Sequence, residues 1–545
     1  MACSLPPSVV GILGVFALIA ILWSRRDRRL DTIPGPRGHP IVGIGLGFPP
    51  NAANVFRQWA HEYGDLFKIR VGWYNWVVVN SPEAMREIFD KQSAYTSSKT
   101  PAPILDDVVV GGMRMFTMPY GLKWRRYRTI THQLLAQKAT QSFIPTQSFE
   151  VKQLLWDLAH DNTSSGEFYQ HIRRTSFSIV MTSTYGRRIG HWDNEDVRHA
   201  IESTRILGKV TRPGQFIEDE IPILAKLPHW MQPSRRRAEQ YAKPVLWAKM
   251  RLWNLMKAAI ADGSAPPCFG KDLVLSDYQS QGLTDEDAAW IAGGLVEAGA
   301  ETTTATLNSL VLYLAANPEV QTKANEELSN VIGDSRAPEF DDIVNLPYIH
   351  ACVKEVLRLR PVPVWGIKHF TDQDVVYKDH IIPKGTVVLA NTSAIHYDPT
   401  RYDEPFSFRP ERYIHHDKYA ADYAVMRDPY ARDHFTFGAG RRICPGSRFA
   451  ENTLNLALAN ILWAFAIRPP VAIVDGKERE LEMDTSDKAR EETAFQAPKP
   501  FKVRFIPRNE ERMRILEKNW KVAQETGYTL RGRHVDMYGI ARPNQ

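Results

Sequence analysis

A glycine-rich loop in the last quarter of the chain holds a cysteine whose sulfur is placed to act as a thiolate. Residues 435–446 read FTFGAGRRICPG, and an apolar helix is predicted over 449–465, directly after Cys444. Gly438, Gly440 and Gly446 permit a tight loop whose backbone amides can point at the sulfur. These amides, the start of the helix and two adjacent arginines favour the thiolate over the thiol. The loop therefore predicts a reactive or metal-binding cysteine.

Three roles are open for such a cysteine: a nucleophile, a redox sensor or an iron ligand. A nucleophile needs a histidine base, and no histidine stands beside Cys444 in the sequence, although a spatial neighbour is not excluded. The chain has four cysteines and no CxxC motif, so neither a disulfide framework nor a zinc module is predicted. A buried, inert cysteine describes Cys352 better than Cys444.

A long helix is predicted between Thr284 and Asn317. Thr284, with Asp287 three residues later, forms a capping box at its start. Its centre combines three glycines with a run of threonines, and each interior glycine costs about 1 kcal/mol. Close packing against another helix is one explanation. The other is that the helix opens locally, so that the carboxylate of Glu301 and the hydroxyl of Thr302 reach a bound group.

Shorter elements carry further charged residues. The helix predicted over 348–359 places Glu355 and Arg358 on one face. Taken alone, such a pair is usually a solvated surface bridge. The irregular segment 408–412 adds Arg412. A short hairpin is predicted from strands at 66–71 and 76–80, and a further strand at 387–390.

Together these motifs resemble the cytochrome P450 family of haem-thiolate monooxygenases, from Ile33 to about Arg508. The loop matches the family's FxxGxRxCxG pattern at Phe437, Gly440, Arg442, Cys444 and Gly446. The segment Ala298-Gly299-Ala300-Glu301-Thr302 matches its oxygen-activation helix, and Glu355-Val356-Leu357-Arg358 matches its ExxR motif. The order and spacing of the motifs agree as well. The resemblance implies the cytochrome P450 fold, which is mainly α with small β-sheets (α+β).

The resemblance also implies a role for each motif residue. Cys444 is expected to be the axial ligand of a haem b iron, and its electron donation favours O–O cleavage. Glu301 and Thr302 are expected to relay protons to bound dioxygen. Arg412 is expected to join Glu355 and Arg358 in a network that locks the fold. The other residues expected to contact the haem or its propionates are Phe437, Gly438, Gly440, Arg442, Trp124, Arg128 and His369.

His369 departs from the commonest pattern, because many relatives carry an arginine at that place. An alignment slip of one residue gives the role to Lys368 instead. A neighbouring propionate is expected to raise the pKa of the histidine.

The expected reaction inserts one oxygen atom of O2 into a C–H or C=C bond of a hydrophobic small molecule, a fungal secondary metabolite or an aromatic intermediate. Electrons are expected from a membrane-bound NADPH–cytochrome P450 reductase, with cytochrome b5 as an additional donor, because no flavin or nicotinamide domain fits in the chain. The expected basic docking face comprises Lys123, Arg125, Arg126, Lys138, Arg441 and Arg448.

Two other functions remain open. One is an O2-independent rearrangement or dehydration. The intact Glu301-Thr302 pair argues against this function. The other is a membrane-anchored haem-binding protein without turnover.

By the same resemblance, the roof of the substrate pocket is expected from residues 97–119, 211–230, 298–303, 362–367 and the turn near 494–495. Its visible side chains are apolar and aromatic, which favours a hydrophobic substrate. Residues 213–230 also look like a membrane-dipping entrance.

The N-terminus predicts a membrane anchor. Residues 9–23 carry no polar side chain, and four arginines follow between positions 25 and 29. Positive charge after the apolar run favours an uncleaved signal anchor over a secretory signal, with a cytosolic catalytic domain at the endoplasmic reticulum membrane. A buried core helix is the alternative. The expected organisation is an anchor over 1–24, a basic, proline-rich hinge over 25–40, a monooxygenase domain over 41–508 and a basic extension of unknown role over 509–545.

Composition excludes several other classes of protein. The 545 residues are 43% hydrophobic and 24% charged, which is ordinary for a globular chain with a large core. A disordered chain, a collagen and a multi-span transporter are therefore excluded. The net charge of +6 is small for this length, so nucleic acid is not an expected partner.

Overall fold

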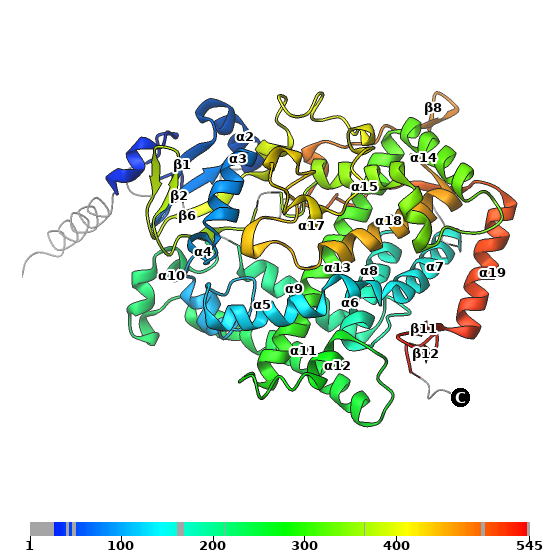
Figure 1. Cartoon of the computed structure of the whole chain (residues 1–545), viewed down its shortest axis with the longest axis horizontal. Coiled ribbons are helices and arrows are strands. Elements are labelled where there is room, and N and C mark those ends of the chain that lie inside the picture. Colours follow the sequence, from blue (N-terminus) through cyan, green and yellow to red (C-terminus); the bar gives the residue numbers. More distant parts are fainter. Residues whose placement is uncertain are drawn as a thin grey trace, which may run out of the picture.

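The computed structural model of the protein describes residues 27–39, 43–45, 51–160, 168–212, 214–364, 366–491 and 496–541. The anchor expected over 1–24 lies outside these residues, as do Trp365 and Phe495 of the expected pocket. Within the described ranges, no helix is long and apolar enough to cross a membrane. The described part is mainly helical with small β-sheets, which confirms the predicted fold class (Figure 1).

Long helices form most of the body. They are α2 (Ala52–Tyr63), α5 (Leu122–Leu134), α7 (Ile144–His160), α8 (Phe168–Tyr185), α9 (Glu195–Val210), α11 (Arg235–Ala261), α13 (Asp285–Ala316), α14 (Pro318–Val331), α15 (Pro347–Leu359), α18 (Ser447–Ala464) and α19 (Glu510–Thr526). Short helices connect them: α3 (Pro82–Met85), α4 (Ser93–Thr96), α6 (Gln137–Gln141), α10 (Ile217–Glu220), α12 (Phe269–Leu275), α16 (Thr392–His396) and α17 (Ala420–Tyr423).

Helix α13 runs through the body and begins as the sequence predicts. Thr284 is its N-cap, and the capping box with Asp287 is complete. The helix is continuous to Ala316, so of the two explanations for its glycines the structure does not show a local opening. Gly299 serves close packing instead: a Cβ there would stand 3.1 Å from a methyl carbon of Val180, on the neighbouring α8. The threonine hydroxyls bond back to carbonyls one turn earlier, which satisfies them inside the helix.

A four-stranded sheet lies at the end of the molecule where the first described residues are found (Figure 1). Its strands, in the order β1-β2-β6-β3, are β1 (Leu66–Val71), β2 (Tyr74–Val79), β6 (Val387–Ala390) and β3 (His369–Phe370). The antiparallel β1–β2 pair confirms the predicted hairpin, and β6 has its predicted bounds. Because β3 pairs with β6, His369 lies opposite Val388 and is fixed in the sheet.

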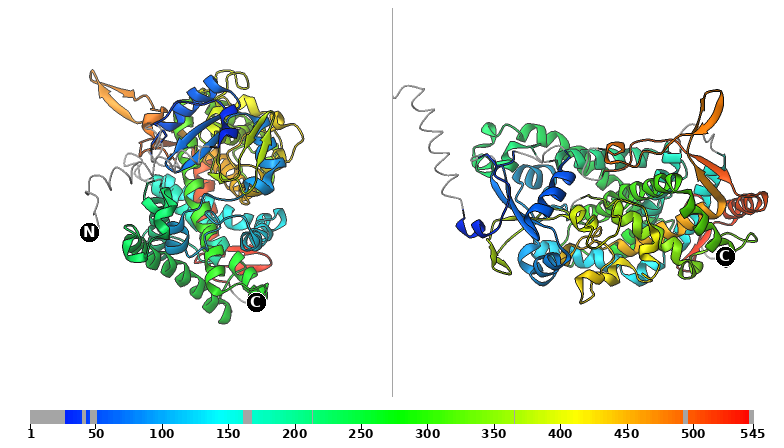
Figure 2. Two further views of the ribbon diagram at one scale, coloured as in Figure 1. Left: turned by 90° about the vertical axis from the view of Figure 1, so that its left-hand side faces the viewer. Right: turned by 90° about the horizontal axis from the view of Figure 1, so that it is seen from above.

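The remaining strands form two-stranded sheets. They are β4 (Val375–Tyr377) with β5 (His380–Ile382), β7 (Phe465–Arg468) with β10 (Arg504–Pro507), β8 (Val471–Val474) with β9 (Lys477–Glu480), and β11 (Tyr528–Leu530) with β12 (Arg533–Val535). The β8–β9 hairpin projects from the body (Figure 2).

Helix α18 directly follows the cysteine loop and is buried along nearly its whole length. It packs with residues of α13 and α15 in one continuous hydrophobic core. The predicted helix over 449–465 is therefore correct, and it starts two residues earlier, at Ser447. This packing fixes the C-terminal side of the loop to the most buried part of the protein.

The C-terminal extension is folded onto the body. In α19, Trp520 stacks edge-on against Phe149 of α7, at 5.5 Å between ring centroids. Farther along, Arg531 pairs with Asp272 of α12 at 2.6 Å. The extension thus runs from the α14–α18 side of the molecule across α7 to α12.

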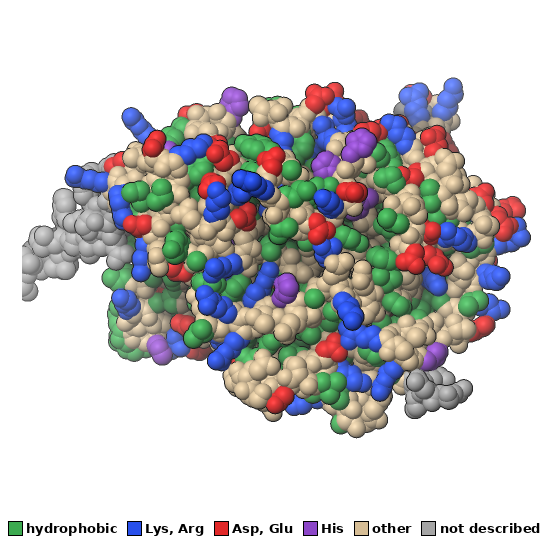
Figure 3. Space-filling model, in the orientation of Figure 1, with side chains coloured by type: hydrophobic (Ala, Val, Ile, Leu, Met, Phe, Trp, Pro, Cys, Tyr) green, Lys and Arg blue, Asp and Glu red, His purple; other side chains and the backbone are tan. Residues whose placement is uncertain are grey.

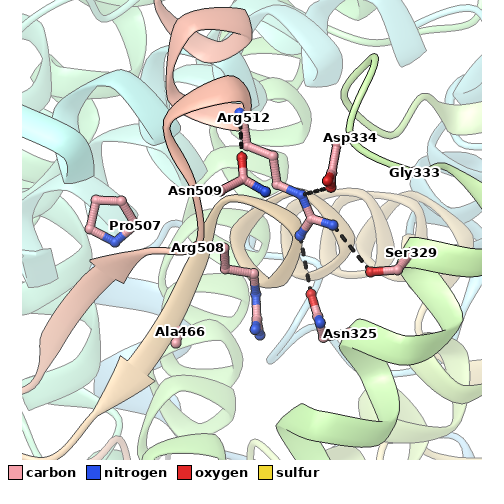
Figure 4. A pocket seen from close by; sticks show the side chains of 9 residues that line it. All are labelled: Asn325, Ser329, Gly333, Asp334, Ala466, Pro507, Arg508, Asn509 and Arg512. Atoms are coloured by element: carbon pink, nitrogen blue, oxygen red, sulfur yellow. Dashed lines mark hydrogen bonds and ion pairs between the residues drawn. The ribbon is translucent and has the colours of Figure 1, made fainter.

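A pocket of about 490 Å³ opens where the extension begins (Figure 4). Arg512 crosses it and donates hydrogen bonds to Asp334, Asn325, Ser329 and the Trp463 carbonyl. The pocket is therefore spanned by a side chain that joins α19 to the end of α14 and to α18.

Candidate functional site

The cysteine loop is shaped by two glycines in the left-handed region. Gly438 and Gly440 have φ angles of 77° and 60°. A Cβ on Gly440 would stand 2.0 Å from the Phe89 carbonyl oxygen, so no other residue fits there. The Gly440 N–H donates to Asp90 Oδ1 at 2.7 Å, which ties the loop to the segment before α4.

Cys444 lies at the end of this loop. Its N–H donates to the Phe437 carbonyl at 2.8 Å, and the Phe437 ring lies 5.6 Å from that of His434. Burial raises the pKa of the Cys444 thiol, whereas the Gly446 N–H and the charge of Arg128 lower it. The loop alone therefore favours the thiol, contrary to the expectation from the sequence. A thiolate here calls for a bound metal cation, because coordination deprotonates a thiol.

Trp124, Arg128 and Arg442 come together beside the loop. The Arg442 guanidinium lies over the Trp124 ring, 4.2 Å from its centroid. Arg128, also on α5, donates to the Ile443 carbonyl at 2.6 Å. Burial and the charge of Arg128 lower the pKa of Arg442 to about 9. Arg442 also donates to the carbonyls of Ser97, Met115 and Met118.

His369 faces the same cluster from β3. Its Nδ1 lies 2.7 Å from the Thr96 carbonyl oxygen, so Nδ1 carries the proton and Nε2 is the acceptor. Burial and the positive charges of Lys99 and Arg442 hold the pKa of His369 well below its usual value. The histidine is therefore neutral in the surroundings that the protein alone provides.

Lys99 is a buried cation that the sequence patterns did not single out. Its Nζ donates to the Lys368 carbonyl at 2.8 Å. Burial, Arg442 and Lys368 hold the pKa of Lys99 well below its usual value. The ammonium of Lys368 itself lies 5.5 Å from the centroid of the Trp76 ring. A single loop lysine has no periodic signal, so Lys99 is recognised only from its tertiary burial.

These side chains fit an anionic cofactor. The Trp124 Nε1 is buried without an acceptor among the described residues. Lys99, Arg128 and Arg442 bring buried or partly buried positive charge to the same place. Buried charge is costly unless it is paired. Two carboxylates, such as the propionates of haem b, would supply the missing acceptor and the missing negative charge.

Glu301 and Thr302 are adjacent on α13 but bond to partners on different helices. The Glu301 carboxylate pairs with Arg173 of α8, whose Nε donates at 3.1 Å. The Thr302 hydroxyl donates to the Ala298 carbonyl at 2.7 Å. Glu301 is therefore anchored from the neighbouring helix, while Thr302 is held by its own.

The Glu355–Arg358 pair is fully buried. Arg358 donates from Nε and Nη2 to the two oxygens of Glu355, both at 2.8 Å, and neither side chain is exposed. Arg412 reaches the same carboxylate at 3.3 Å. Arg358 also donates to the carbonyls of His396 and Pro405. The pair thus joins α15 to two segments far along the chain and is no surface bridge.

A second buried ion pair on α15 had no sequence signal. Lys354 Nζ contacts Asp433 at 2.6 Å, with both side chains fully buried. Glu451 of α18 lies 3.8 Å from the same ammonium, and burial raises its pKa to about 7. This cluster ties α15 to the segment that leads into the cysteine loop.

Some cations of the expected basic docking face already pair with carboxylates of the chain. Lys123 pairs with Asp287 at 3.0 Å, and Arg448 pairs with Asp422. The exposed cations of this face without an acidic partner among the described residues are Arg125, Arg126, Lys138 and Arg441. Lysine and arginine side chains are visible over α5 in Figure 3.

Comparison with known proteins decides the family. The sequence model of the family described as "Cytochrome P450" matches residues 33–487 of the chain. The chain belongs to the cytochrome P450 family. It is 51% identical over 537 residues to the cytochrome P450 monooxygenase pgmC of Aspergillus terreus, covering 98% of this chain and 97% of the relative. It is 37% identical over 532 residues to verL of Clonostachys rogersoniana, covering 97% and 96%.

A third relative, virE of Hypocrea virens, is 32% identical over 517 residues, covering 94% of this chain and 92% of the relative. Like these three, the protein is a cytochrome P450 monooxygenase, a haem-containing oxidoreductase. Members of this family hold the haem iron through a cysteine thiolate. The resemblance inferred from the sequence motifs is thereby confirmed.

Proposed function

We propose that this cytochrome P450 inserts one oxygen atom of O2 into a C–H or C=C bond of a hydrophobic small molecule. For a C–H bond the balance is R–H + O2 + NADPH + H⁺ giving R–OH + H2O + NADP⁺. The haem, when bound, supplies dioxygen binding and O–O cleavage. Cys444 would hold its iron through the thiolate, within the loop that Phe437, Gly438 and Gly440 shape. Trp124, Arg128, Arg442 and His369 would meet its propionates.

The observation that carries the proposal is the placement of Glu301 and Thr302. Glu301 is about one-third exposed, so its carboxylate can exchange protons with water. The Thr302 hydroxyl is satisfied within the helix, and a rotation about χ1 lets it donate elsewhere. A carboxylate and a hydroxyl on adjacent residues form the proton path that dioxygen reduction needs. An O2-independent rearrangement has no use for this path, and neither does a haem-binding protein without turnover.

Electrons would come from an NADPH–cytochrome P450 reductase, with cytochrome b5 as an additional donor. Monooxygenases of this family generally require a redox partner. The unpaired cations Arg125, Arg126, Lys138 and Arg441 support docking of an acidic partner on the α5–α6 side. Lys123 and Arg448 contribute less, because carboxylates of the chain already neutralise them.

The protein would be attached to the endoplasmic reticulum membrane by a single anchor over 1–24, with the catalytic domain in the cytosol. Exposed apolar side chains between α10 and α11 support a second membrane contact. Ile223, Trp230 and Met231 are 50%, 81% and 45% exposed. Such side chains prefer a bilayer surface to water.

The substrate class would be a fungal secondary metabolite or an aromatic intermediate. The fungal sources of the relatives support this class. A comparison of metabolites between the producing cell and a deletion strain identifies the compound that accumulates without the enzyme. That compound is then incubated with the holoenzyme, reductase and NADPH under ¹⁸O2.

Incorporation of one ¹⁸O atom per product, dependent on NADPH, is the expected result. Conversion without NADPH and without ¹⁸O would instead establish a rearrangement or dehydration. Absence of any conversion, with haem intact and reductase active, would favour the haem-binding protein without turnover.

A further inference from the structure

Four segments of the chain meet at a cluster of charges on α13. Arg114 Nε donates to Glu297 Oε1 at 2.9 Å, and its Nη1 donates to Thr211 Oγ1 at 2.9 Å. Lys249 Nζ lies 3.6 Å from the other oxygen of the same carboxylate. The side chains of Arg114, Lys249 and Glu297 are 10%, 5% and 14% exposed. A cluster this buried is not a solvated surface network.

The cluster lies close to the candidate haem site. Glu297 precedes Glu301 by one helical turn, so the two carboxylates leave α13 on the same side. The segment that directly follows Arg114 is bonded to Arg442 through the carbonyls of Met115 and Met118. Arg114 and Thr211 also belong to two segments expected to roof the substrate pocket. The cluster thus joins this roof to the helix that would face the haem.

Lys249 is the member of the cluster with unused bonding capacity. It is buried, and its Nζ pairs with the Glu297 carboxylate at 3.6 Å, an ion pair longer than an ordinary hydrogen bond. One face is covered by the Trp290 ring, whose centroid is 4.6 Å away. An ammonium group has three N–H donors. The single long ion pair with Glu297 leaves donors of this buried ammonium for a further oxygen acceptor, and a buried donor without an acceptor is costly.

A glycine of α13 makes room for this lysine. A Cβ on Gly293 would stand 2.9 Å from Lys249 Cγ and 3.1 Å from Nζ. An alanine there would displace the ammonium. Gly293 is one of the glycines that make α13 a poor helix by propensity, and the position of Lys249 accounts for it.

The charges of the cluster favour an anionic ligand. Two cations, Arg114 and Lys249, face one carboxylate, Glu297. Asp106 also acts on Arg114, but burial raises the pKa of that carboxyl to about 6. All three nitrogens of Arg114 donate hydrogen bonds, whereas Lys249 makes one long ion pair with Glu297, so Lys249 is the cation with donors left for a ligand.

We propose that Lys249, supported by Arg114 and oriented by Glu297, binds an anionic oxygen substituent of the substrate, a carboxylate or a phenolate. This inference rests on the proposed function and narrows its substrate class to hydrophobic molecules with one acidic group. The ion pair fixes the acidic end of the substrate against α11, and the apolar remainder extends toward the haem.

Soret difference spectra of the holoenzyme test this inference, because they report ligand entry without turnover. The probes are arylcarboxylic acids of increasing size, from benzoic acid to 4-phenylbenzoic acid, each paired with its methyl ester. The wild-type protein is expected to bind at least one acid more tightly than its ester. Lys249→Met is expected to weaken the binding of that acid by about tenfold or more and to leave the ester unchanged.

Two further variants and one control separate recognition from stability. Lys249→Gln keeps a polar side chain of similar length and is expected to lose the preference for the acid as well. Glu297→Gln removes the competing internal carboxylate and is expected to increase that preference. Arg251→Met removes a cation two residues away on α11, where it pairs with Glu195 and Asp196, and is expected to change nothing.

The inference is overturned if no acid of the series binds the wild-type protein more tightly than its ester. Equal weakening of acid and ester in both Lys249 variants would likewise assign the cluster a purely structural role. These spectra need bound haem but neither reductase nor O2. A failure of the acid-binding inference is therefore distinguishable from a failure of the proposed monooxygenase function, which ¹⁸O incorporation tests.

Discussion

Arg173 of α8 and Glu301 of α13 form an ion pair next to the proposed proton path. The Arg173 Nε donates to Glu301 Oε1 at 3.1 Å, and Nη2 makes a second hydrogen bond to the same oxygen. The guanidinium also lies over the Trp192 ring, 4.9 Å from its centroid. The two side chains are 34% and 32% exposed. The carboxylate thus has a fixed position and remains in contact with water.

Arg173→Met is expected to uncouple the proposed reaction, because Glu301 loses the group that positions it. The fraction of NADPH recovered as product should fall by about tenfold, which is less than the ~10²-fold typical of removing a proton donor itself. Peroxide should rise correspondingly. Arg173→Lys should restore part of the coupling. Arg336→Met breaks an exposed pair with Asp342 and serves as the control. Unchanged coupling in Arg173→Met would exclude the positioning role.

Cys444→Ala is expected to abolish the red-shifted Soret band of the ferrous carbonyl complex, because the haem would lack its thiolate ligand. Cys352→Ala is the matched control. Burial raises the pKa of the Cys352 thiol well above its usual value, and the side chain is enclosed in the core. The control should keep the shifted band with some loss of stability. A shifted band in Cys444→Ala would show that another residue ligates the iron.

Glu355→Ala is expected to lower the free energy of unfolding by about 3–5 kcal/mol, because Arg358 would remain as an uncompensated buried charge. Arg412→Ala should cost less, since Arg412 is partly exposed and reaches the carboxylate at 3.3 Å. Urea unfolding of the haem-loaded proteins measures the free energy of unfolding of both variants. Stability equal to wild type in Glu355→Ala would contradict the role of this pair.

Arg512→Ala is expected to destabilise the protein by about 2 kcal/mol, because Arg512 links α19 to Asp334, Asn325 and Ser329 across the pocket of Figure 4. Arg514→Ala is the control, since Arg514 lies two residues later and is 74% exposed. Thermal unfolding compares the two variants. Equal melting temperatures would mean that the extension adds nothing to the stability of the body.

Local signals in the sequence were sufficient for much of the fold. The capping box at Thr284 and the proline after Asn317 define α13 at both ends. The glycines of that helix were ambiguous, because their meaning depends on which side chain faces them. Val180 and Lys249 come from α8 and α11, and no pattern within α13 reveals them.

The same limit applies to the site. Motifs with fixed spacing located the loop, the Glu355–Arg358 pair and Glu301. Lys99, Lys249 and Lys354 were missed, because each is a single lysine whose burial arises only from tertiary packing. The direction of the Cys444 pKa in the protein alone could not be predicted for a related reason: the sequence shows the nearby amides and arginines but does not show the packing around the thiol that raises its pKa.

His369 is expected to make haem retention depend on pH. In the surroundings of the protein alone, burial, Lys99 and Arg442 hold its pKa well below the unfolded value of about 6.5. The haem-free protein therefore has its full His369 contribution above that value and loses it as the pH falls through the lower folded pKa. Replacing His369 with a residue that cannot titrate should remove this acid sensitivity.

Bound propionates are expected to reverse the direction of the His369 pKa shift, and with it the pH dependence. Their negative charge beside Nε2 is expected to raise the pKa of His369, so the contribution to haem binding is full below about 6.5 and is lost as the pH rises through the raised value. Haem loss should accelerate above neutrality in the wild-type protein, and His369→Arg should flatten this dependence. His369→Ala should release haem faster than Lys368→Ala, because the Lys368 ammonium lies over Trp76. Haem-loss rates measured across pH decide between the two residues: a damaging Lys368→Ala with a silent His369→Ala would move the propionate contact to Lys368.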